Sequence, residues 1–206
     1  MIELILNRRS CRRYLNKDIE SSVIKKIIDC GRAAPFGGKP IPKCQVAEYI
    51  VVKDKNIKEK LALQYEDRQF IKDAPAIIAV LANKNNDPKY KEYILSASLS
   101  IGNMIIAAET LGLGSCVLSC FMNHKKHEED KDTLRKALEL PDNIELVCLL
   151  ALGYRDNTEK IPNKQLSDYN NVVHMNTYIN KNEKFCWHLL TNVINFYIMR
   201  TIVRRC

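Results

Sequence analysis

The chain has 206 residues, of which 46% are hydrophobic, and its formal net charge is +8. This length fits one domain that can bury a substantial core. The excess charge lies at two ends, because residues 1–17 and 176–206 each hold five arginines or lysines against one glutamate. A nucleic-acid surface would spread basic residues over several elements, whereas a short cluster suits one phosphate group. We therefore rank nucleic-acid binding last among the function classes.

Targeting signals and cysteine spacing restrict the class of protein further. No basic start followed by an apolar stretch and a small-residue cleavage site occurs, so we expect a cytoplasmic protein. The eight cysteines are scattered through expected helices and strands, which is typical of reduced, buried thiols. Cys116 and Cys120 are four positions apart, but no nearby pair of His or Cys completes a zinc site. We predict no bound metal.

Helices and strands alternate along the chain. Apolar residues at helical spacing predict a helix over 21–32, and the short apolar run at 76–82 predicts a strand buried on both faces. On the same grounds we expect helices at 1–7, 56–64, 94–111 and 125–138, strands at 46–52, 115–121 and 146–154, and a last extended segment at 172–178. This order indicates an α+β or α/β arrangement around one sheet.

The stretch at 94–111 is apolar or small nearly all round and carries one charge, Glu109. Such a helix has no polar side to expose to solvent, so it should lie in a core or in a subunit interface. We expect it to end at Gly112, because a glycine there supplies a left-handed cap before the next strand.

Two other segments carry the polar chemistry. Four guanidiniums fall within residues 8–13, and they must be solvated, paired with acids or turned toward an anion. Residues 33–43, AAPFGGKPIPK, contain three prolines and two glycines, which predict an exposed or ligand-facing loop. No dinucleotide-binding fingerprint, Walker loop, zinc-protease motif or nucleophile elbow is found. This combination favours a bound cofactor that supplies the chemistry itself.

Five segments together resemble the nitroreductase family of FMN-dependent oxidoreductases. They are NRRSCRRY near the start, AAPFGGKPIP, DAPAIIAVLA, IGNMIIAAETLGLGSCVLSCF and LPDNIELVCLLALGY. The resemblance runs from residue 1 to about residue 178 in the expected order. It implies an α+β, three-layer sandwich with a mainly antiparallel central sheet flanked by helices. It also implies that 94–111 is a long interface helix and that 1–180 is the FMN-binding domain. From its own apolar pattern, we expect 181–206 to form a C-terminal helical extension.

The resemblance further implies a homodimer with FMN at the subunit interface and NADH or NADPH as electron donor. The positions matched to the FMN phosphate and ribityl chain are Arg8, Arg9, Ser10 and Arg12. The loop that reaches the flavin from the partner matches Pro35, Phe36, Gly37 and Gly38. The strand end beside the flavin ring matches Val117, Leu118, Ser119 and Cys120. No side chain is expected to be catalytic, because the flavin N5 carries the hydride.

Some positions depart from the family pattern. Phe36, Lys39, Ile41 and Lys43 replace the usual Ser, Asn, Gln and Trp of the loop. The family places a Lys/Arg pair on the phosphate after Gly153-Tyr154. Here Lys160 and Lys164 match that region, with Asn163 or Gln165 where the Arg is expected.

The primary expectation is an enzyme that reduces a small-molecule electron acceptor, such as a nitroaromatic or a quinone, by ping-pong hydride transfer. The alternative is a non-enzymatic flavin-binding or interaction protein of the same fold.

Residues 182–206 lie outside the resemblance and contain a wide apolar arc interrupted by His188, Asn192, Asn195 and Arg200. We rank packing across the dimer first for this tail, contact with a membrane surface second and a membrane-spanning anchor last.

Overall fold

A computed structural model describes residues 1–37, 41–65, 68–89, 91–120, 132–156, 158 and 164–178. Contacts divide the chain into two units, Met1–Asn163 and Lys164–Cys206. The predicted C-terminal helix, the tail from residue 182 and the boundary at residue 180 concern residues outside the described part, and they stay predictions. Among the described residues, no helix is long and apolar enough to cross a membrane.

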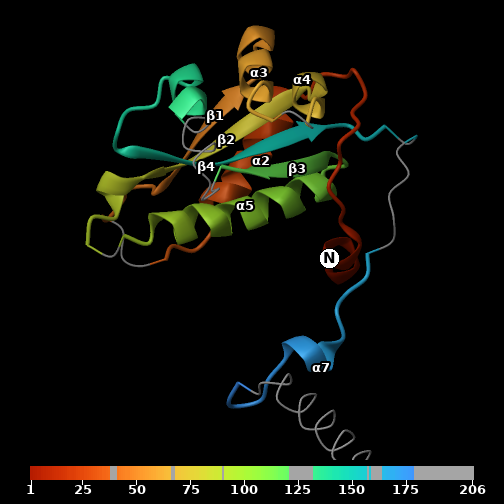
Figure 1. The fold of residues 1–206 in the computed structure, drawn as a ribbon, viewed down its shortest axis with the longest axis vertical. Helices are drawn as coiled ribbons and strands as arrows, with labels where there is room; N and C mark the ends of the chain where they lie inside the picture. The colour runs from red at the N-terminus through yellow and green to blue at the C-terminus, as the bar shows by residue number, and fades with distance from the viewer. Residues whose placement is uncertain are drawn as a thin grey trace, which may run out of the picture. The chain divides into compact units, whose positions relative to one another are not determined.

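The first unit contains a four-stranded sheet with the strand order β1-β2-β4-β3, and every pair of neighbours is antiparallel (Figure 1). The strands are β1 (Ala47–Val52), β2 (Ala76–Asn83), β3 (Gly114–Ser119) and β4 (Ile144–Gly153). The helices are α1 (Ile2–Asn7), α2 (Ser21–Arg32), α3 (Lys55–Ala62), α4 (Phe70–Asp73) and α5 (Tyr93–Thr110), with a 3-10 turn η1 (Lys84–Asn86). Residues 132–137 are also helical. The predicted α+β fold with an antiparallel sheet is confirmed.

Helices cover both faces of the sheet because each face is apolar. On one face, a buried cluster joins the sheet to α3, α4 and the helical residues near Leu134. On the other face, a second cluster joins it to α2 and α5, which Figure 1 shows across the sheet from α3 and α4. Strand β2 is buried along almost its whole length, as its unbroken apolar run predicts.

Helix α5 packs one side against α2 and the sheet, through Ala97, Ser100, Met104 and Ala108. The approach to α2 is close, since a Cβ placed on Gly31 would lie 2.7 Å from Met104 Cγ. The helix ends where the sequence predicts, because Gly112 takes the left-handed φ of 76°. In the single chain, α5 is therefore packed on one side rather than buried all round.

The second unit contains α7 (Tyr169–Val172), whose first turn is capped by Asp168 accepting a hydrogen bond from Asn170 N at 2.9 Å. The extended segment predicted at 172–178 begins one residue later than expected, because Val172 is the last residue of α7 while Val173 has an extended backbone. Asp168 is a good N-cap for a short helical turn, and this local interaction overrides the extended preference of Val172.

Candidate functional site

The N-terminal segment 8–14 runs along the ends of β3 and β4. Cys11 N donates to Ser115 O at 2.9 Å, and Ser10 forms a parallel bridge with Ser115. Further along, Leu15 N donates to Tyr154 O at 2.9 Å. Backbone hydrogen bonds to β3 and to the residue that follows β4 therefore hold the arginine-rich segment against the sheet.

A pair of glycines makes room for this segment. Gly114 of β3 and Gly153 of β4 are directly opposite each other in the sheet. A Cβ on Gly114 would lie 2.5 Å from both Cβ and Sγ of Cys11. A Cβ on Gly153 would lie 2.6 Å from the Tyr14 ring. The segment can lie this close only because neither strand residue has a side chain.

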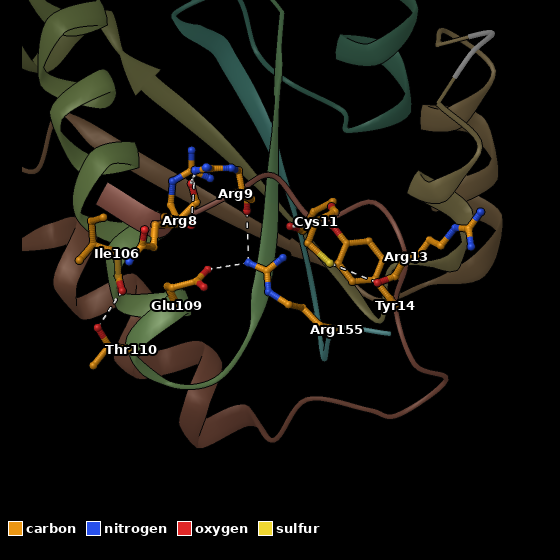
Figure 2. Close-up of polar contacts among 11 residues, drawn as sticks. Arg8, Arg9, Cys11, Arg13, Tyr14, Ile106, Glu109, Thr110 and Arg155 are labelled. Atoms are coloured by element: carbon orange, nitrogen blue, oxygen red, sulfur yellow. Dashed lines mark hydrogen bonds and ion pairs between the residues drawn. The ribbon is translucent and has the colours of Figure 1, made fainter. Parts of the chain in front are cut away.

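Cys11 and Tyr14 anchor the segment from the inside. The Cys11 side chain is fully buried, and the Tyr14 hydroxyl donates to Cys11 O at 2.7 Å. The Tyr14 ring also packs near Phe70 of α4, with the ring centroids 6.5 Å apart. The arginines occupy the positions beside these anchors, as the adjacent pairs Arg8–Arg9 and Arg12–Arg13. Figure 2 shows Arg8, Arg9 and Arg13 around Cys11 and Tyr14.

The arginines differ in what they can offer to a ligand. Arg8 is half-buried and Arg12 is exposed. Arg9 turns back on its own segment, since its Nη1 donates to Arg8 O at 3.0 Å. Arg9 therefore has a local structural role, and guanidiniums such as those of Arg8 and Arg12 match the oxygens of an anion.

The pKa of the buried Cys116 thiol of β3 is affected by several side chains of the arginine segment. Burial raises its pKa above the ordinary value of a thiol, while Arg12 and Arg68 act in the opposite direction. The Ser10 hydroxyl and Arg8 also lower it. Arg8, Ser10, Arg12 and Arg68 thus lie close enough to Cys116 to affect the same group. Arg68 was not among the predicted site residues, because it stands in a charged stretch with no pattern of its own.

Arg155 is a second residue that the sequence analysis missed. Its Nη2 donates to Glu109 Oε2 at 2.8 Å and to Arg9 O at 3.2 Å (Figure 2). Both side chains of the ion pair are largely buried, with 22% and 23% of their surface exposed. One signal was available, because Glu109 is the only charge in an apolar helix and a buried carboxylate needs a partner.

The predicted loop lies at the other end of α5. Gly37 N donates to Ser96 Oγ at 3.0 Å, and a Cβ on Gly37 would meet Leu95. Pro35 and Phe36 are exposed, and Gly38 lies outside the described residues. Ser96 and Glu109 are 13 positions apart on α5, which corresponds to about 20 Å along the helix. Within one chain, the loop and the arginine segment are therefore not brought together.

The predicted strand end shows a strict alternation. Leu118 and Cys120 are buried in the core, while Val117 and Ser119 are exposed. Strand β3 is an edge strand, and Ser115 O accepts its bond from Cys11 outside the sheet. Because backbone groups alternate in direction along an antiparallel strand, residues 117 and 119 also present their N–H and C=O groups at this outer edge.

The two predicted lysines are not brought to the arginine segment by any described contact. Lys160 lies outside the described residues. Lys164 is exposed and begins the second unit. Their contact with a phosphate stays a prediction. Within the described residues, no group of three or more His, Cys, Asp or Glu side chains is arranged to hold a metal ion.

The first unit is thus an antiparallel α+β domain with a basic segment bound along its edge strand β3. Residues 5–65 and 62–154 match the sequence profile of the nitroreductase family. A protein from Archaeoglobus fulgidus, provisionally named NADH dehydrogenase/NAD(P)H nitroreductase, is 31% identical over 158 residues, which cover 74% of this chain and 84% of that relative. The chain belongs to the nitroreductase family, a family of oxidoreductase enzymes.

Solved structures agree with this assignment. The FMN-dependent nitroreductase from Clostridium difficile is 28% identical with a TM-score of 0.73, and the match covers 86% of this chain and 100% of that one. A Bacteroides thetaiotaomicron protein, provisionally named NADH dehydrogenase/NAD(P)H nitroreductase, is 28% identical with a TM-score of 0.73, over 86% and 97% of the two chains.

Proposed function

We propose that the protein is an FMN-dependent oxidoreductase that uses NADH or NADPH to reduce nitroaromatics, quinones or similar electron-poor acceptors. Family membership and the name of the Clostridium difficile relative support FMN as the cofactor. The observation that carries the proposal is the arginine-rich segment held over the glycine pair at the edge of β3.

The residues of this region fit a phosphate-bearing cofactor. Arg8 and Arg12 supply guanidiniums that match phosphate oxygens. Two buried polar atoms at the same place, Ser115 Oγ and Arg155 Nη1, have no hydrogen-bond partner among the described residues. Buried polar groups normally form hydrogen bonds, so the Ser115 hydroxyl and the Arg155 guanidinium can each form a further hydrogen bond to a ligand. Arg8 and Arg12, together with Ser10 on the same segment, would hold the phosphate and ribityl chain.

When bound, FMN supplies hydride transfer from the nicotinamide donor to the acceptor. The protein contributes position and shielding rather than a nucleophile. Backbone groups at residues 117 and 119 lie at the outer edge of β3, where they can donate to a neighbouring ring system. The buried core behind them, with Leu118 fully buried, keeps this strand fixed.

We also propose that the active form is a homodimer. The side of α5 that does not face α2 or the sheet carries apolar residues, with Leu95 48% and Leu99 37% exposed. An apolar groove of about 780 Å³ continues this surface between α1, α2 and α5, next to Ile106 and Leu111. A second copy would cover this surface. It would also bring the 35–37 loop of one chain toward the arginine segment of the other, which one chain alone does not achieve.

The visible absorbance of the purified protein tests the proposal. We expect a flavin spectrum that bleaches on anaerobic addition of NADH or NADPH and returns when a quinone or nitroaromatic is added. A protein that binds FMN but is not reduced by either nicotinamide would favour the non-enzymatic alternative. A protein that remains colourless after incubation with FMN would contradict the proposal.

A further inference from the structure

Arg155 connects three separate parts of the chain. It follows the end of β4, its ion-pair partner Glu109 lies in the last turn of α5, and the backbone carbonyl that it holds belongs to Arg9 (Figure 2). The Arg155 backbone also forms an antiparallel bridge with Tyr14. The guanidinium therefore links the end of the long helix to the segment that carries the arginines.

The geometry suits an arginine. One Nη2 group bonds to a carboxylate oxygen at 2.8 Å and to a carbonyl oxygen at 3.2 Å, and the planar guanidinium fixes the direction of both bonds. The Glu109 carboxylate compensates a charge that would otherwise be buried unpaired. Because α5 is long and packed against α2 and the sheet, Glu109 holds Arg155 from a rigid support.

We infer that Arg155, oriented by Glu109, is a positioning residue for the phosphate group of FMN. Arg155 fixes the Arg9 carbonyl, and this bond orders the backbone from which Arg8 and Arg12 extend. A segment that is already ordered in the free protein loses less conformational entropy when it binds the phosphate. This inference rests on the proposed function, since it assigns the arginine segment to the cofactor phosphate.

Two ligands that differ only in the phosphate test the inference. The dissociation constants of FMN and riboflavin are measured by flavin fluorescence for the wild type, Glu109→Gln, Arg155→Met and Arg155→Lys. We expect Glu109→Gln and Arg155→Met to weaken FMN binding roughly tenfold more than riboflavin binding, comparable to the loss of a hydrogen bond to a charged group. Arg155→Lys keeps the charge and a partner for Glu109 but loses the planar fork, so FMN binding should also weaken.

Glu145→Gln is the matched control, because Glu145 forms another partly buried ion pair, 4.0 Å from Lys84, away from this segment. It should bind both ligands as the wild type does. Thermal unfolding of each apoprotein shows which variants are folded, and Arg155→Lys, which retains the buried charge pair, serves if Arg155→Met does not fold.

An equal loss of affinity for FMN and riboflavin would show a general structural role and overturn the inference. Unchanged FMN affinity in the folded variants would overturn it as well. Failure of the wild type to bind FMN would instead contradict the proposed function, so the two failures are distinguishable.

Discussion

Gly114→Ala tests whether the arginine segment depends on the glycine pair beneath it. The new methyl carbon would lie 2.5 Å from Cys11 Cβ and Sγ and 3.0 Å from Arg155 Cγ. Ordinary carbon–carbon contact begins near about 3.5 Å, so the overlap with Cys11 is about 1 Å. Cys11 is fully buried and is held by its backbone bond to Ser115, so it cannot turn aside. The segment must lift away from β3.

The expected cost follows from that overlap. Overpacking of a buried site destabilises by about 1–3 kcal/mol. Replacing a strand glycine by alanine regains about 0.5–1 kcal/mol of backbone entropy, so the middle of the two ranges leaves a net loss of about 1 kcal/mol. For a domain of this size, the melting temperature should fall by about 2–4 °C. FMN affinity should fall roughly tenfold or more if the shift breaks one charge-assisted hydrogen bond.

The assays are thermal unfolding of the apoprotein and fluorescence titration with FMN. Cys11→Gly removes both clashing atoms and provides the control. Cys11→Gly alone should destabilise, but the double variant should be less destabilised than the sum of the two single variants, by at least about 1 kcal/mol. Strictly additive effects, or a Gly114→Ala protein with wild-type stability and FMN affinity, would refute the close-approach argument.

Three further predictions concern the arginines, the exposed side of α5 and alkaline stability. Arg12→Ala should weaken FMN binding by about 1.5–3 kcal/mol. Arg13→Ala is the control and should not weaken it, because the Arg13 side chain points away from Arg8 and Arg9 (Figure 2). Equal FMN dissociation constants for the two variants, measured by fluorescence titration, would contradict the assignment of Arg12 to the phosphate. Leu99→Arg should convert the proposed dimer to monomer in sedimentation, whereas Val51→Arg, at a similarly exposed position on β1, should leave it intact. Burial raises the pKa of Tyr65, so its ionisation above about pH 10 favours the unfolded chain and stability should fall there as pH rises. Tyr65→Phe should flatten that fall in urea titrations at pH 9 to 11, and an unchanged slope would exclude the assignment to Tyr65.

Local patterns predicted the elements where periodicity and end signals agree. Helix 21–32 has the bounds of α2, and the unbroken apolar run near 76–82 is the central strand β2. The cap at Gly112 follows from the conformational freedom of glycine alone. Short elements were missed, because the four residues of α4 are too few to show a period.

The site was predictable only where sequence neighbours act together. The cluster at residues 8–12 is a local pattern, and the structure places it beside β3. Arg155 was missed, because it joins the segment through a tertiary contact that no spacing encodes. Arg68 was missed, because its influence on the Cys116 thiol likewise depends on the fold. The pairing of Gly114 with Gly153 depends on strand register, which becomes visible only when β3 and β4 lie side by side.

The bridge between Ser10 and Ser115 also affects whether the edge of the sheet can pair with another molecule. Strand β3 is the last strand of its sheet, and an uncovered outer strand can pair with a strand of another molecule. The arginine segment occupies the beginning of that edge and surrounds it with positive charge. The residues proposed to hold the cofactor therefore also protect the sheet from edge-to-edge association. Loss of this segment would expose a pairing surface as well as remove the proposed binding site.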